Sequence, residues 1–234
     1  MITFLFTVIP PILILSFFIL TDKFKEPKTT IITVFFLGFL ICLPAGILNQ
    51  LSHDFFFTGT DYSENLTGSF LGPAWAEELL KFSILYLIIL KRDEFNEPMD
   101  GLVYGVVVSL GFATYENYTY VYEWASTVAK EENFDFLEFS YLVAKGRSYS
   151  AIPMHGLNGA VMGYYFGLYA FSGNKNYLAL SLILPYLFHG FYNFLGWPNM
   201  MIVIIILVIV SLNLHSKLRK LQLAKKKEQE VKKI

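Results

Sequence analysis

Seven runs of mostly apolar residues follow one another along the chain, separated by polar segments. The runs cover approximately residues 2–20, 29–48, 73–90, 101–122, 151–171, 177–195 and 198–214. A helix needs about 17–25 mainly apolar residues to cross the hydrocarbon core of a bilayer, and each run is close to that length. The pattern therefore predicts an all-α fold, a polytopic bundle of about seven transmembrane helices.

Basic residues alternate between the connecting segments and predict the orientation of the bundle. The first, third and fifth segments and the tail hold them, as Lys23, Lys25, Lys28, Lys91, Arg92, Lys175 and eight residues after position 216. Segment 49–72 and the sixth segment have none, and in segment 123–150 five acids outnumber three basic residues. The positive-inside rule then places the N-terminus outside and the C-terminus in the cytoplasm. A further helix in either long segment is expected to be re-entrant or interfacial.

Composition supports an integral membrane protein. Of 234 residues, 55% are hydrophobic and only 16% are charged, whereas soluble domains carry about 25% charged residues. The single cysteine, Cys42, excludes a disulfide within the chain and a zinc ribbon. We expect residues 1–214 to form one membrane domain. We expect residues 215–234 to form a basic cytoplasmic tail that contacts anionic lipid headgroups.

Polar side chains interrupt four of the apolar runs. They are Glu77, Glu78, Lys81, Glu116, His155, His189 and Asn193. A charge at the bilayer centre costs about 2.5–3.5 kcal/mol on insertion scales, so these residues are expected to have internal partners. With the predicted orientation and a rise of 1.5 Å per residue, all four runs place them about 18–24 Å from the cytoplasmic end. The sequence thus predicts one polar layer in the outer half of the bilayer.

Helical spacing assigns these residues to interior faces. Lys81 lies three and four residues after the two glutamates, so it can pair with either, and His189 and Asn193 share a face at i,i+4. Two stripes of small residues, Gly101-Gly105-Ser109-Ala113 and Gly159-Gly163-Gly167, also repeat every four residues. Such stripes let helix backbones approach closely. We therefore expect an interior site between packed helices.

This combination of groups suits hydrolysis by activated water. A buried glutamate can act as a general base, and histidine and asparagine side chains can stabilise an oxyanion. The same groups could instead hold a divalent metal such as zinc, with ligands drawn from Glu77, Glu78, Glu116, His155 and His189. The chain has no His-Glu-x-x-His, no Gly-x-Ser-x-Gly and no pair of membrane aspartates. Lys81 can serve as a charge-balancing partner, and His155 as a site residue or a structural histidine.

The ordered motifs resemble the PrsW family of bacterial membrane proteases. They are Glu77-Glu78-x-x-Lys81, Pro98-Met99-Asp100-Gly101-Leu102-Val103-Tyr104-Gly105, Gly111-Phe112-x-x-x-Glu116-Asn117, His155 and His189-x-x-x-Asn193. The resemblance covers about residues 70–195. It is shared more distantly with the CAAX-prenyl and bacteriocin-processing proteases, which have His where this chain has Glu116 and an Arg one residue after the position of Lys81.

The resemblance implies an intramembrane endopeptidase of the bacterial cytoplasmic membrane. It implies that Glu77 is the water-activating base, with Glu78 as its partner and Glu116 in the second motif. It also implies that His189 and Asn193 bind the oxyanion. The implied substrate is a membrane-anchored protein such as an anti-sigma factor, cleaved near the extracytoplasmic side, and nucleic acid is not an expected partner. Whether the mechanism is glutamic or metal-assisted stays open.

Two other functions use similar residues. An ion- or proton-coupled transporter also places carboxylates and histidines in the membrane, although the chain shows neither an inverted repeat nor paired broken helices. A non-catalytic membrane scaffold would keep the fold and use the charges as structural ties between helices. Cleavage of a membrane-anchored substrate that depends on Glu77 and His189 separates the protease from both.

Overall fold

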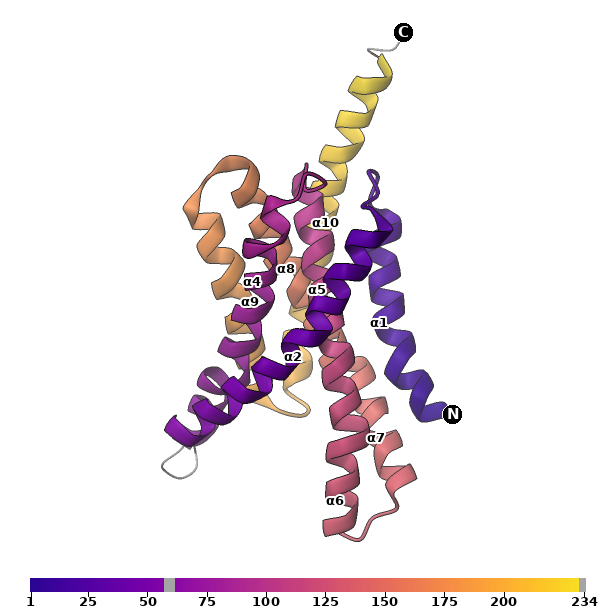
Figure 1. Ribbon diagram of the computed structural model, residues 1–234, viewed down its shortest axis with the longest axis vertical. Helices are drawn as coiled ribbons and strands as arrows, with labels where there is room; N and C mark the ends of the chain where they lie inside the picture. Colours follow the sequence, from indigo (N-terminus) through magenta and orange to yellow (C-terminus); the bar gives the residue numbers. More distant parts are fainter. Residues whose placement is uncertain (57–61, 232–234) are drawn as a thin grey trace.

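The chain forms a bundle of helices in the computed structural model, which describes residues 1–56 and 62–231 (Figure 1). The α-helices are α1 (Ile2–Thr21), α2 (Lys28–Phe56), α3 (Tyr62–Ser69), α4 (Trp75–Leu87), α5 (Pro98–Tyr118), α6 (Ala125–Glu131), α7 (Phe136–Tyr149), α8 (Ala151–Ser172), α9 (Lys175–Leu195) and α10 (Met200–Val231). Short π-helical turns at Phe70–Ala74 and Thr119–Trp124 precede α4 and α6, and a 3₁₀ turn at Ile89–Lys91 follows α4. No β-strand occurs in the described part of the chain.

The predicted all-α membrane bundle is confirmed, and each of the seven predicted runs coincides with a helix. By length and composition alone, α1, α2, α9 and α10 can each cross a membrane. Their exposed apolar side chains, for example Leu13, Ile32, Ile183 and Ile209, suit surfaces that face lipid. The orientation of the termini stays a prediction.

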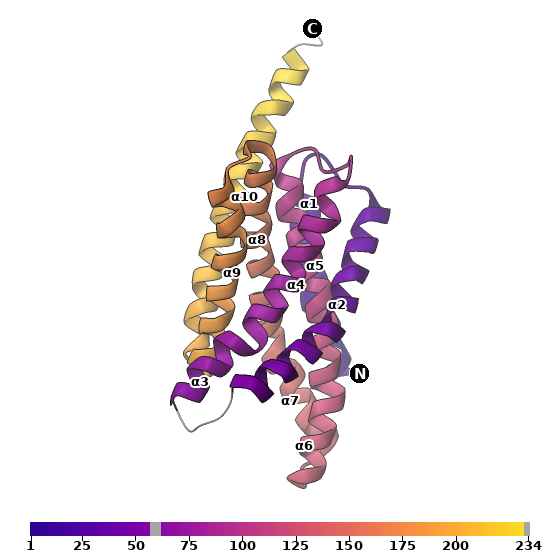
Figure 2. The ribbon, with the colours of Figure 1, turned by 60° about the vertical axis from the view of Figure 1, so that its left-hand side comes forward.

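α5 is the central helix of the bundle. Its side chains are buried without interruption from Met99 to Ala113. α8 packs along it through the two predicted stripes of small residues, so closely that a Cβ on Gly163 would lie 2.0 Å from the carbonyl oxygen of Gly101. α2 crosses α5 on another side, and α9 and α10 lie beside α8 (Figure 2). This contact between α5 and α8 brings the polar residues of both helices together.

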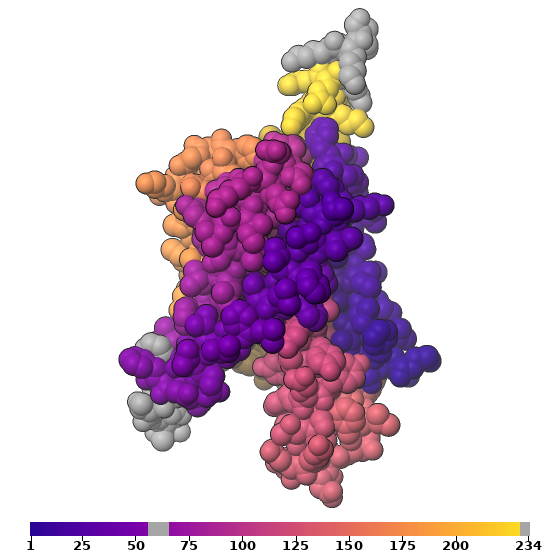
Figure 3. Space-filling model, in the orientation of Figure 1, coloured from indigo at the N-terminus to yellow at the C-terminus, as the bar shows by residue number. Residues whose placement is uncertain are grey.

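The bundle projects at both ends (Figure 3). α6 and α7 form a helical hairpin that extends beyond the other helices at one end, and α10 extends beyond them at the other. Segment 123–150 is therefore mostly helical, in two pieces. α10 continues without a break through residue 214, so the division into residues 1–214 and a tail at 215–234 stays a prediction, and its residues 232–234 lie outside the described part.

Candidate functional site

The structure brings all seven predicted site residues together around one cavity of about 680 Å³. α4 supplies Glu77, Glu78 and Lys81, α5 supplies Glu116, α8 supplies His155, and α9 supplies His189 and Asn193. Five of them line the cavity, whereas Glu78 and Lys81 lie behind its wall and are almost completely buried. The predicted polar layer is therefore a contiguous group and not a scatter of separate charges.

A break in the helix ahead of α4 places the two glutamates at the cavity. Gly72 has a non-helical backbone (φ −84°, ψ −117°), and Pro73 follows it, where the missing N–H prevents a regular helix. Both residues line the cavity. α4 therefore starts beside the cavity, with Glu77 and Glu78 in its first turn. The positive end of the helix dipole favours carboxylates at that position.

Glu78 ties α4 to α9 and sets the orientation of His189. Its Oε1 accepts hydrogen bonds from Nζ of Lys81 and from Nδ1 of His189, both at 2.8 Å. Because a carboxylate only accepts, Nδ1 of His189 carries a proton. In the neutral imidazole the lone pair is then on Nε2, which lies 4.0 Å from Oε2 of Glu77. Glu78 thus turns the free nitrogen of His189 toward Glu77.

Lys81 and His155 continue the network to α5. Nζ of Lys81 lies 3.0 Å from Nδ1 of His155, and Nε2 of His155 lies 2.9 Å from Oε2 of Glu116. An ammonium has no acceptor, so Nδ1 accepts from Lys81 and Nε2 donates to Glu116. The ammonium also lies 4.2 Å from the centre of the Phe112 ring, which favours a desolvated cation. This packing accounts for a fully buried lysine.

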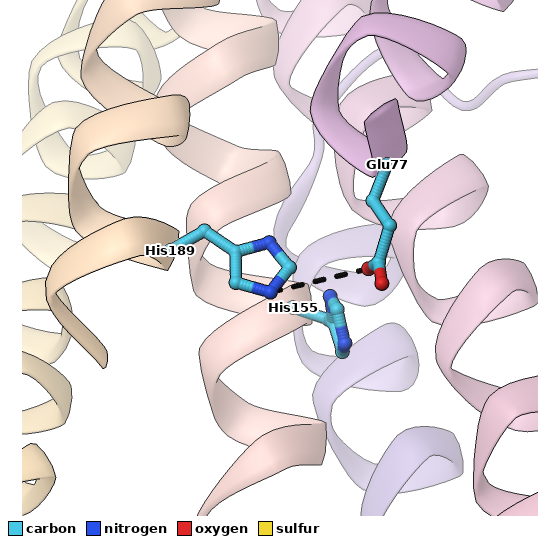
Figure 4. A group of neighbouring side chains, drawn as sticks. All are labelled: Glu77, His155 and His189. Atoms are coloured by element: carbon cyan, nitrogen blue, oxygen red, sulfur yellow. Dashed lines mark ion pairs between the residues drawn. The ribbon is translucent and has the colours of Figure 1, made fainter. Parts of the chain in front are cut away.

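Glu77, His155 and His189 offer three donors close enough to hold a metal ion (Figure 4). Both ring nitrogens of His155 are hydrogen-bonded here, to Lys81 and to Glu116, so this ring would ligate only after giving up one of these bonds. One ligand atom of each lies within 4.8 Å of the others. Oε2 of Glu77 is buried without a hydrogen-bond partner, and its 4.0 Å distance to Nε2 of His189 is within twice a zinc–ligand bond of about 2.0–2.2 Å. The bond from His189 to Glu78 is the usual support for a metal-binding imidazole.

The net charge of the cluster also favours a bound cation. Glu77, Glu78 and Glu116 bring three carboxylates, and Lys81 and Arg147 bring two cations. With neutral imidazoles the cluster carries one net negative charge, which is costly in a buried place. A bound cation or a proton held by one carboxylate offsets that charge.

Asn193 presents an unused donor to the same cavity. It lies one helical turn after His189 and lines the wall. Its Nδ2 is buried and has no hydrogen-bond partner. An amide donor held in this way can bind a carbonyl oxygen that gains negative charge.

Arg147 also lies at the candidate site, and the sequence interpretation missed it. It lies in α7, lines the cavity and donates from Nη2 to Oε2 of Glu116 at 2.7 Å. In the sequence it counts only as one charge in an acidic segment. The sequence did contain one signal for it. The predicted polar layer holds three carboxylates but only one basic residue, Lys81, so a second cation was needed to balance the charge.

The comparisons with known proteins agree with the motifs. The family model described as PrsW family intramembrane metalloprotease matches residues 26–214. A Protease PrsW of Clostridioides difficile (strain 630) is 32% identical over 223 residues, which cover 90% of this chain and 88% of the relative. A Protease PrsW of Oceanobacillus iheyensis is 33% identical over 80% of this chain and 79% of the relative. One of Bacillus subtilis (strain 168) is 33% identical over 80% and 78%. No solved structure matches the chain.

Proposed function

Because the chain belongs to the PrsW family of intramembrane proteases, we propose that it cleaves a membrane-anchored protein near the extracytoplasmic side with water activated at Glu77. The observation that carries the proposal is the arrangement around the cavity. Oε2 of Glu77 has no hydrogen-bond partner, Nε2 of His189 lies 4.0 Å away, and Nδ2 of Asn193 is also unpartnered. These atoms provide a base and a donor in one buried place.

In this mechanism, the carbonyl oxygen of the scissile bond accepts a hydrogen bond from Nδ2 of Asn193. Oε2 of Glu77 takes a proton from water while the water oxygen attacks the carbonyl carbon. The carbon–nitrogen bond then breaks, and Glu77 returns the proton to the leaving amine. Glu78 and Lys81 hold the surrounding groups in place.

A divalent metal such as zinc could be held at the same corner by Glu77, by His189 and, once it gives up its bond from Lys81, by His155. When bound, it would supply Lewis-acid activation of water and carbonyl. Support comes from Oε2 of Glu77, which has no hydrogen-bond partner, from the orientation of His189 and from the net negative charge of the cluster. The metal content of purified parent, Glu77→Gln and His189→Ala proteins tests it. Equal, stoichiometric zinc in all three would contradict this ligand set.

The proposed substrate is a single-span protein such as an anti-sigma factor, cut close to its membrane anchor. The cavity is lined by Tyr120, just before α6, and by Arg147 of α7, so it adjoins the α6–α7 hairpin, which projects at one end of the bundle. The charge pattern of the connecting segments predicts that this end faces outward. A cut there would release an extracytoplasmic domain.

The test is co-expression with a panel of single-span reporters whose juxtamembrane segments come from anti-sigma factors. Cleavage is read on gels for the parent, Glu77→Gln and Asn193→Ala. We expect Glu77→Gln to lower the rate at least 10³-fold and Asn193→Ala about 10²–10³-fold, as for loss of a base or an oxyanion donor. Glu94→Gln, at the opposite end of the bundle, is the matched control and should keep the parental rate. Undiminished cleavage by Glu77→Gln would refute the proposal.

A further inference from the structure

We propose that Arg147 is a positioning residue of the site, which fixes His155 by holding Glu116. The inference rests on the proposed function, and it extends the site beyond the motif residues to the α6–α7 hairpin. Arg147 is two residues from the end of α7. It joins the hairpin to the cavity.

Three contacts fix the guanidinium of Arg147. Nη2 donates to Oε2 of Glu116 at 2.7 Å, and Nε donates to Oδ1 of Asn117 at 2.8 Å. The guanidinium also lies over the ring of Tyr120, with 4.2 Å from Cζ to the ring centre. A planar guanidinium can satisfy two acceptors and stack on a ring at once, which an ammonium cannot reproduce. The side chain is only 14% exposed.

Glu116 connects Arg147 directly to His155, because one of its oxygens accepts a hydrogen bond from each of them. Oε2 of Glu116 accepts from Arg147 and from Nε2 of His155 at 2.9 Å. Without Arg147, the carboxylate of Glu116 loses its charged anchor and can turn away from the imidazole. His155 would then be held through Nδ1 by Lys81 alone. Its ring would no longer have a fixed angle at the cavity.

A purely structural role for Arg147 would consist of docking α7 against α5. The two roles differ in the property that they affect. Docking affects the stability of the whole bundle whatever residue stands at position 116. Positioning affects turnover, and it does so only while Glu116 can receive the bond.

A double-mutant cycle with Arg147→Met and Glu116→Leu, which removes the acceptor, tests this difference. We expect Arg147→Met to lower kcat about 10–100-fold, as for loss of a partner behind an active-site group, with KM changed less than threefold. On the Glu116→Leu background the same change should cost less than about twofold. Arg147→Lys should restore part of the loss. Equal losses of kcat on both backgrounds would overturn the proposal.

Lys145→Met is the matched control, because Lys145 is an exposed cation on the same helix, whose ammonium lies 5.9 Å from the centre of the Tyr141 ring. It should leave kcat and melting temperature unchanged. A cost from Lys145→Met as large as that from Arg147→Met would mean that any charge on α7 matters, which also overturns the proposal.

A second measurement does not depend on proteolysis. Reaction of His155 with diethyl pyrocarbonate, followed by mass spectrometry of the peptide, reports whether Nε2 is held by Glu116. We expect at least threefold faster modification in Arg147→Met than in the parent and in Lys145→Met. If the parent cleaves no reporter but this change appears, the proposed function fails and the positioning role stands. If the parent cleaves and His155 reacts equally in all three proteins, the positioning role fails.

Discussion

Replacement of Gly163 by alanine should disrupt the site from a distance. Gly163 lies in the middle of α8, where its backbone touches α5. A Cβ at this position would lie 2.0 Å from the carbonyl oxygen of Gly101 and 2.8 Å from Cα of Leu102. Both neighbours are backbone atoms, so no side chain can rotate to make room. The two helices themselves must separate.

The size of the effect follows from these distances. Ordinary contact begins at 3.4 Å, so the Cβ is short of it by about 1.4 Å, and overpacking of this kind costs about 1–3 kcal/mol. For a chain of this length, 1 kcal/mol shifts the melting temperature by about 2–4 °C. We therefore expect a decrease of about 2–12 °C. The site depends on the same contact, because α5 carries Glu116 and α8 carries His155, whose bond is 2.9 Å.

The assay compares melting temperature and reporter cleavage in detergent for the parent, Gly163→Ala and a control, Gly146→Ala. Gly146 lies in helix α7, and a Cβ there meets nothing within 4 Å. Alanine at an open helical position is more favourable than glycine by up to about 1 kcal/mol. The control should therefore melt at the same or a slightly higher temperature. A Gly163→Ala protein with parental melting temperature and cleavage would refute the reasoning that backbone contact holds α5 and α8 in place.

Four further outcomes are expected. Lys81→Met should destabilise the protein by about 3–5 kcal/mol, because it leaves buried carboxylates without their cation; a parental melting temperature would contradict this. Gly190→Ala should slow cleavage, since its Cβ would lie 2.2 Å from the ring of Phe70, and Phe70→Leu should partly restore the rate. If Glu77, His155 and His189 hold zinc, removal of metal by a chelator should abolish cleavage, and zinc should restore it; full activity of metal-free protein would favour glutamate-only chemistry. Burial raises the pKa of Glu26, between α1 and α2, so the folded state favours its protonated form. The contribution of this group to stability is therefore present at acid pH and is lost as pH rises above about 4.5. Glu26→Gln should make the melting temperature fall less steeply between pH 4.5 and 8.

The seven helices and the close contact between α5 and α8 could be predicted because each depends on one property of the local sequence. A membrane helix needs an apolar run of fixed length, so the run marks the helix whatever its neighbours do. A glycine every fourth residue marks close approach in the same way, and Gly105 and Gly163 do face each other, with 2.8 Å from the Cβ position of Gly105 to Cα of Gly163. The helix ends were less predictable. α2 continues to Phe56 and α10 to Val231, because polar residues outside an apolar run can still be helical.

The position of Arg147 could not be predicted from local sequence. Its partner Glu116 lies 31 residues earlier, on the other side of the α6–α7 hairpin. The acids near it in segment 123–150 suggest a solvated surface. The packing of α7 against α1 and the turn before α6 instead directs this one side chain inward. The direction of the Arg147 side chain therefore depends on tertiary contacts. The sequence alone shows only that this position carries a charge, which needs a partner if it is buried.

The hydrogen-bond partners of His189 and Asn193 show what spacing can and cannot decide. Two residues at i,i+4 share a helix face, so their common approach to the cavity follows from spacing alone. Their chemistry depends on partners from other helices. Nδ1 of His189 donates to Glu78, so the neutral ring presents a lone pair and not a donor. Nδ2 of Asn193 has no partner and keeps its protons available. We therefore propose Asn193 as the oxyanion donor of the pair, and His189 as the residue that holds a proton or a metal.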